Sequence, residues 1–156
     1  MTAPDIPKLR RILADNRTIA VVGLSVNPSR PSHYVSRYML DHGYQIIPVN
    51  PRYAGEEVLG QKCYASLREV PEPVGIVNCF RKSADIAPIA QEAIAIGAKV
   101  LWMQIGVINE EAERLALAAG LKVVVDRCIK IEYARLFGGL SFAGVDPKAI
   151  SAKRPF

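Results

Sequence analysis

The sequence contains no run of about 18 apolar residues, so no segment of it predicts a membrane-spanning helix. Its three cysteines include no C-x-x-C pair and are odd in number, which argues against a zinc site and against a disulfide framework. The N-terminal residues MTAPDIPK lack the apolar stretch of a secretion signal. We therefore expect a cytoplasmic protein that does not associate with membranes.

Several catalytic signatures are missing as well. The chain has no Walker sequence, no recognisable Ser-His-Asp set and no metal-ligand spacing, and this makes an enzyme the less favoured interpretation. The formal net charge of +5 favours an anionic partner. Because no basic run exceeds two residues, however, a small phosphate-bearing ligand is favoured over nucleic acid.

Five apolar, β-branched segments are present, and they alternate with segments of helical periodicity along the chain. The five segments are residues 18–24, 44–49, 75–80, 99–104 and 121–126. This alternation predicts an α/β fold, a three-layer Rossmann-like domain with a five-stranded parallel sheet in the order 3-2-1-4-5. The domain is expected to span residues 1–137, and residues 138–156 are expected to form a basic, Gly/Pro-rich C-terminal tail.

Residues 17–52 have the βαβ pattern of a nucleotide-binding crossover. The first apolar segment ends in Gly23, but the second and third glycines of G-x-G-x-x-G are absent. The second segment ends in Asn50 and Arg52 rather than in a carboxylate, so NAD is disfavoured. Arg52 suits a phosphate on the adenosine ribose, which leaves NADP and coenzyme A (CoA) as candidate ligands.

Six motifs, in this order, resemble the small CoA-binding protein family, which is similar to the N-terminal domain of the succinyl-CoA synthetase α subunit. They are VVGLS (21–25), SRPS (29–32), PVNPR (48–52), EVLG (57–60), WMQIG (102–106) and DRCIKIE (126–132). The resemblance covers residues 5–137 and implies CoA as the ligand. In the synthetase a second domain supplies the catalytic phosphohistidine, whereas the only histidines here, His33 and His42, lie in the first expected crossover helix. The resemblance therefore implies ligand binding without the ligase reaction.

The resemblance also implies roles for particular residues. The diphosphate would be wrapped by Gly23, Ser25, Val26, Asn27 and Pro28, with Arg30 as the counter-charge. The ribose 3′-phosphate would be held by Asn50, Pro51 and Arg52. The adenine side would be flanked by Asn78, Phe80 and Arg81, and the pantetheine path would be lined by Met103, Gln104 and Gly106.

Other interpretations stay open. Arg52 also fits an NADP-dependent reductase, and an interaction protein with a vestigial nucleotide site could dock a partner through its basic residues 148–156. A protein partner or a homo-oligomer is compatible with either view. Cys128 follows Arg127 at an expected helix start, where a thiol pKa falls, so a reactive thiol facing the CoA sulfur is a further hypothesis. Its alternative is a small buried residue that packs the last helix.

Overall fold

The apolar segments form a five-stranded parallel sheet in the computed structural model, which describes residues 6–138. The strands are β1 (Thr18–Val22), β2 (Gln45–Val49), β5 (Ile76–Cys79), β6 (Val100–Met103) and β7 (Lys122–Val124). Every residue of β5 and β6 is buried, as expected for strands covered on both faces.

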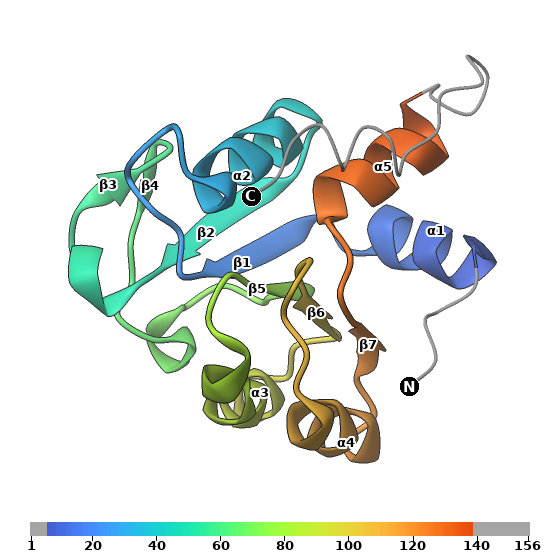
Figure 1. Cartoon of the computed structure of the whole chain (residues 1–156). Helices are drawn as coiled ribbons and strands as arrows, with labels where there is room; N and C mark the ends of the chain where they lie inside the picture. Colours follow the sequence, from blue (N-terminus) through green and yellow to red (C-terminus); the bar gives the residue numbers. More distant parts are fainter. Residues whose placement is uncertain (1–5, 139–156) are drawn as a thin grey trace.

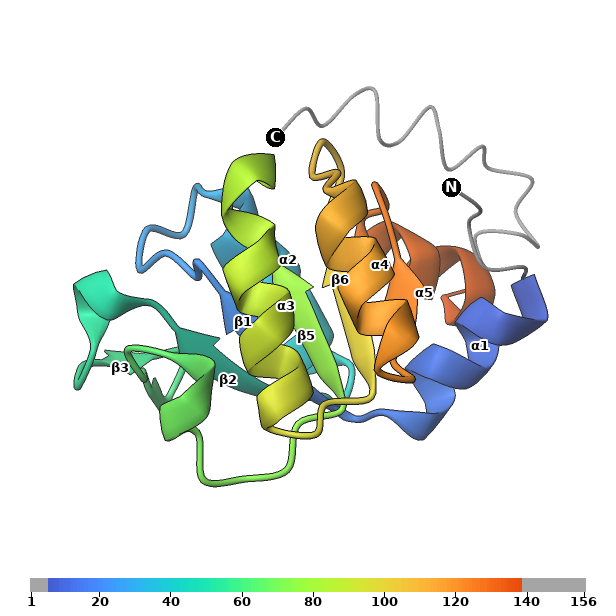
Figure 2. The same ribbon diagram turned by 90° about the horizontal axis from the view of Figure 1, so that it is seen from below.

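Helices cover both faces of this sheet (Figures 1 and 2). One face carries α1 (Ile6–Asp15), α2 (Pro31–Asp41) and α5 (Ile129–Phe137), and the other carries α3 (Ile86–Ala95) and α4 (Glu110–Ala118). Because side chains alternate along a strand, Ala20 and Val22 pack toward α3 and α4. Ile19 and Val21 pack toward the other three helices. The predicted three-layer, Rossmann-like fold class is confirmed.

The predicted strand order needs one correction. The sheet runs β2-β1-β5-β6-β7, so the third expected strand, β5, pairs with β1 instead of lying outside β2. The outer edge of β2 is already occupied, because Tyr64 N donates to Pro48 O (3.0 Å) and Asn50 N donates to Tyr64 O (2.8 Å). Pro48 also lacks an N–H for a further strand, which is why proline in a sheet is confined to edge strands.

The connection from β2 to β5 supplies Tyr64. It contains a short antiparallel hairpin, β3 (Glu57–Val58) and β4 (Gln61–Lys62), and no α-helix. With β2 and β5 on opposite sides of β1, the chain leaves β1 toward α2 on one face and leaves β5 toward α3 on the other (Figure 1). Such a switch point opens a crevice at the carboxyl ends of the strands.

The described part of the chain, residues 6–138, has no helix with the length and apolar character that crossing a membrane requires. Except for Gly138, the expected tail lies outside the described residues, so the division of the chain into a domain and a tail stays a prediction.

Candidate functional site

A cleft of about 710 Å³ opens at the switch point. Its walls come from the loop after β1, the first turn of α2, the turn after β2 and the loops after β5 and β6. This volume lies within the usual range for small-molecule and cofactor sites. The lining residues are Gly23, Ser25, Asn27, Arg30, Pro31, Ser32, Asn50, Pro51, Arg52, Tyr53, Phe80, Arg81, Lys82, Asp85, Gln104, Ile105 and Val107.

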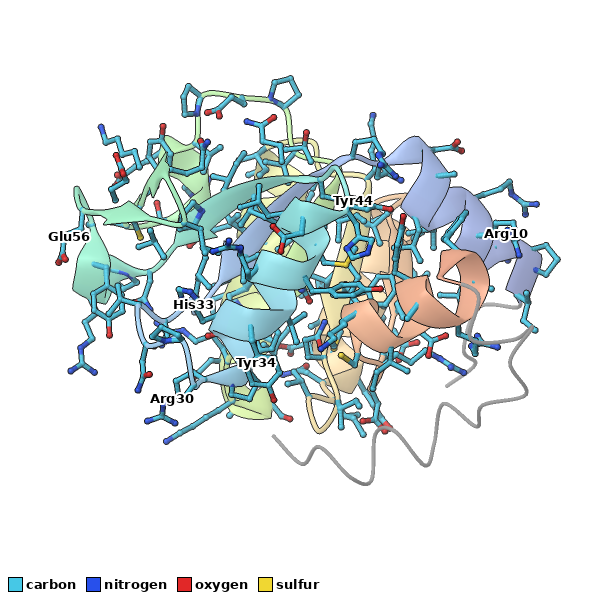
Figure 3. All side chains as sticks on the ribbon, turned by 90° about the horizontal axis from the view of Figure 1, so that it is seen from above. Arg10, Arg30, His33, Tyr34, Tyr44 and Glu56 are labelled. Carbon is cyan, nitrogen blue, oxygen red and sulfur yellow. The ribbon has the colours of Figure 1, made fainter. Side chains whose placement is uncertain are left out.

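Positive charge dominates this lining. Arg30, Arg52, Arg81 and Lys82 line the cleft, and Asp85 is the one acidic residue in that set. Among residues 6–138, no carboxylate forms an ion pair with any of the four cations. Figure 3 shows Arg30 extending outward from the start of α2. The cleft therefore presents net positive charge to an anionic ligand.

Gly23 brings the loop after β1 close to the neighbouring strands. Its N–H donates to Val49 O (2.8 Å), and its φ of +93° lies in the region that favours glycine. A Cβ placed on Gly23 would lie 2.4 Å from Phe80 O, closer than any such pair can approach. The sheet itself thus requires glycine here, whether or not a phosphate is bound.

Two hydroxyl groups shape the rest of this loop. Ser32 Oγ accepts from Ser25 N, and Ser25 Oγ accepts from Asn27 N, both at 3.0 Å. A hydroxyl that accepts from the backbone keeps its own hydrogen for donation. Both serines line the cleft beside the N-terminal end of α2, where the helix dipole also favours anions. This arrangement can hold a phosphate group.

Asn50 joins the ends of β1 and β2. Its side chain is buried, with Nδ2 donating to Leu24 O (3.1 Å) and Oδ1 accepting from Arg52 N (3.0 Å). The amide is thus used within the protein, and it fixes the turn that carries Arg52. The Arg52 guanidinium lies 5.7 Å from the ring centroid of Tyr53, and both residues line the cleft.

Gln104 and Asn78 form a buried amide pair at the ends of β6 and β5. Gln104 Nε2 donates to Asn78 Oδ1 at 2.7 Å. Gln104 lines the cleft, whereas Asn78 does not and is 1% exposed.

Most of the residues predicted for the site lie around one cleft. Those that line it are Gly23, Ser25, Asn27, Arg30, Asn50, Pro51, Arg52, Phe80, Arg81 and Gln104. The remainder are not among the lining residues: Val26, Pro28, Asn78, Met103 and Gly106.

Each of these five has a clear place in the structure. Val26 and Pro28 are exposed in the loop after β1, and Asn78 lies behind Gln104. Met103 is fully buried and packs into the core against α3 and α4. Gly106 is turned toward the β7 end of the sheet, where its N–H donates to Asp126 Oδ1 (2.7 Å). A role for Met103 in lining the pantetheine path therefore has no geometric support.

Sequence reasoning missed Pro31, Ser32, Tyr53, Lys82, Asp85, Ile105 and Val107, which also line the cleft. Several of them directly follow a predicted site residue, as Tyr53 follows Arg52 and Lys82 follows Arg81. Extending each strand-end motif by one residue would have found these. Asp85 carried no such signal, because it reaches the cleft only through the short 3₁₀ turn Ser83–Asp85 that precedes α3.

The hypothesis that the pKa of the Cys128 thiol is lowered was wrong, because the structure raises this pKa. Cys128 is 2% exposed in the core formed with α1, α2 and α5, and this burial raises the pKa of its thiol. Residues 6–138 also contain no group of three or more His, Cys, Asp or Glu side chains suited to a metal ion.

Both histidines have partners within the protein. His33 Nδ1 donates to Ser25 O (2.9 Å), and His42 Nδ1 donates to Tyr38 O (2.7 Å) while its ring stacks on that of Tyr38. Each ring therefore has a structural role at one end of α2.

Residues 17–134, most of the chain, match the family described as the CoA binding domain. The chain belongs to the CoA-binding domain family. The resemblance inferred from the six motifs is thereby confirmed.

Relatives of this CoA-binding domain differ greatly in size. Uncharacterized protein YneT of Bacillus subtilis is 44% identical over 134 residues, which are 86% of this chain and 98% of that protein. A hypothetical protein from Pyrococcus horikoshii has a solved structure with a TM-score of 0.83 and 41% identity, covering 88% of this chain and 99% of that one. The dinucleotide-forming acetyl-coenzyme A synthetase 1 of Ca. Korarchaeum cryptofilum matches at 28% identity and a TM-score of 0.60, over 74% of this chain and 27% of that one.

Proposed function

We propose that this chain binds coenzyme A or an acyl-CoA in the cleft and acts as a binding module that performs no ligase reaction by itself. The observation that carries the proposal is the set of four cations that line the cleft without an ion-pair partner in the described chain. They lie at the switch point of a sheet whose sequence belongs to the CoA-binding domain family.

In this proposal, the diphosphate lies against the loop after β1 and the start of α2. Arg30 supplies charge there, and the hydroxyls of Ser25 and Ser32 are free to donate. Arg52, held through its backbone by Asn50, would bind the 3′-phosphate of the ribose. Four cations and one carboxylate give the lining a net charge of about +3, which suits a ligand carrying a diphosphate and a phosphate monoester.

The proposal assigns no ligase reaction to the matched residues 17–134 themselves. YneT is matched over nearly its whole length, whereas the acetyl-coenzyme A synthetase is matched over about a quarter of its chain. The larger part of the synthetase is therefore not represented in the match, and both histidines here are engaged in local structure.

Calorimetric titration with CoA and with dephospho-CoA tests the proposal. We expect CoA to bind more tightly by about 1.5–3 kcal/mol, the range for a hydrogen bond to a charged group. Arg52→Ala should remove that difference, whereas Arg114→Ala, a matched change at an exposed position on α4, should preserve it. Equal affinities in the unmodified protein would refute the role of Arg52. Failure of both ligands to bind would refute the proposal, and binding of NADPH alone would favour a reductase.

A further inference from the structure

Exposed apolar side chains lie on two of the loops that form the cleft. Among residues 6–138, six large apolar side chains are exposed, and three of them belong to the loops after β1 and β6: Val26, Ile105 and Ile108. Single exposed apolar residues are common on proteins, whereas a group beside a ligand site indicates contact with something apolar. Two of the three lie in one short loop, which makes the loop after β6 the main apolar surface beside the cleft.

Hydrogen bonds to its backbone hold the loop after β6 in place. Gly106 N donates to Asp126 Oδ1 (2.7 Å). Ile108 N donates to Ser83 Oγ (3.0 Å) at the start of the 3₁₀ turn before α3. The side chains of Ile105 and Ile108 nevertheless remain 36% and 43% exposed. Covering them with another apolar group is favourable, and because the loop is already ordered, little ordering cost opposes such a contact.

This apolar surface adjoins the part of the cleft that is farthest from the proposed phosphate sites. Ile105 lines the cleft, and Ser83, which holds Ile108, directly follows Lys82 of the lining. Two strand spacings, about 10 Å, separate β6 from β1, and β2 lies one strand further away. In the proposed function the phosphates lie at the ends of β1 and β2. The opposite end of the ligand, which carries any acyl group, then lies on the side of β6.

We infer that Ile105 and Ile108 form a subsite for the hydrocarbon chain of an acyl group. The ligand class of the cleft is then an acyl-CoA with an aliphatic chain of medium or greater length, rather than free CoA or acetyl-CoA. The chain lies against the loop after β6 and shields both side chains from water. Because the contact is apolar and non-directional, affinity rises with the length of the chain. This inference rests on the proposed function.

Calorimetric titration with acetyl-CoA and octanoyl-CoA tests the inference, since the two ligands differ only in the length of the chain. Burying one methylene group strengthens binding about fourfold. Octanoyl-CoA should therefore bind about tenfold more tightly than acetyl-CoA, as expected when about two methylenes leave water. Ile108→Ser should reduce this ratio about threefold or more. Leu117→Ser, the same kind of change at an exposed position further along α4, should preserve the ratio.

Equal affinities of the unmodified protein for the two ligands would refute the inference, leave the proposed function intact and assign the apolar loop to a protein partner. A ratio that Ile108→Ser leaves unchanged would refute the subsite as well. Binding of neither ligand would instead refute the proposed function.

NMR of the isoleucine methyl groups gives an independent measurement on the unmodified protein. The signals of Ile105 and Ile108 should shift further with octanoyl-CoA than with acetyl-CoA, and equal shifts would contradict a contact with the chain.

Discussion

Replacing Gly23 with alanine separates a requirement of the sheet from a requirement of the ligand. At a φ of +93°, an alanine costs about 1–2 kcal/mol from backbone strain alone. The new Cβ would also lie 2.4 Å from Phe80 O, a backbone atom that can yield only if β5 moves. Overpacking of this kind costs about 1–3 kcal/mol more. We therefore expect Gly23→Ala to lower the free energy of unfolding of the ligand-free protein by about 2–5 kcal/mol.

Gly97 provides the matched control. Its φ is +74°, and no described atom beyond its own chain neighbours lies within 4 Å of the position of its Cβ, so Gly97→Ala should cost the strain alone, about 1–2 kcal/mol. Urea unfolding of both variants without ligand measures the difference. Equal losses of stability would refute the argument that the contact between β1 and β5 demands glycine, and would leave phosphate binding as the explanation for this residue.

Three other predictions follow from buried groups. Asn50→Ala removes the bonds to Leu24 O and Arg52 N and should cost about 1–3 kcal/mol in urea unfolding, and a loss below about 0.5 kcal/mol would contradict that role. Because burial raises the pKa of the Cys128 thiol, Ellman's reagent at about pH 8 should label it only after urea is added, and rapid labelling of the native protein would contradict its burial. Burial raises the pKa of Cys79 to about 12, so the unfolded chain loses this proton first as the pH rises above about 9. The free energy of unfolding should then fall by up to about 1.4 kcal/mol per pH unit until the native thiol also ionises. Urea unfolding of Cys79→Ala at the same pH values should show a smaller fall per pH unit. An identical dependence on pH in the variant and the unmodified protein would contradict the raised pKa of Cys79.

The fold class could be predicted from the sequence because each strand is a short apolar run and each helix has its own periodicity. The strand order could not be obtained in the same way, because it depends on which edge of β1 the third strand occupies. Pro48 was the signal available, since a proline inside a strand argues for the edge of the sheet. The sequence does not show what lies along that edge, because the residue that pairs with it, Tyr64, is 16 residues further along the chain.

The candidate site shows a similar limit. Residues at strand ends could be proposed because parallel strands deliver their carboxyl ends to one edge of the sheet. The direction of each side chain could not, as Asn50 and Met103 illustrate: one turns to Leu24 O and the other into the core. Cys128 fits the same pattern, because its surroundings depend on how α5 packs against α1 and α2. The pairing of Gln104 with Asn78 required β5 and β6 to be neighbours, which the order 3-2-1-4-5 does not provide.

The occupied edge of β2 also bears on how the protein behaves at high concentration. An exposed strand edge is a template on which a second molecule can add a strand and begin to aggregate. Here Pro48 offers no donor and its carbonyl already accepts from Tyr64 N, so that template is blocked near the carboxyl end of the strand. A second molecule adding a strand along this part of β2 would first have to displace Tyr64, which protects this part of the edge against misassembly.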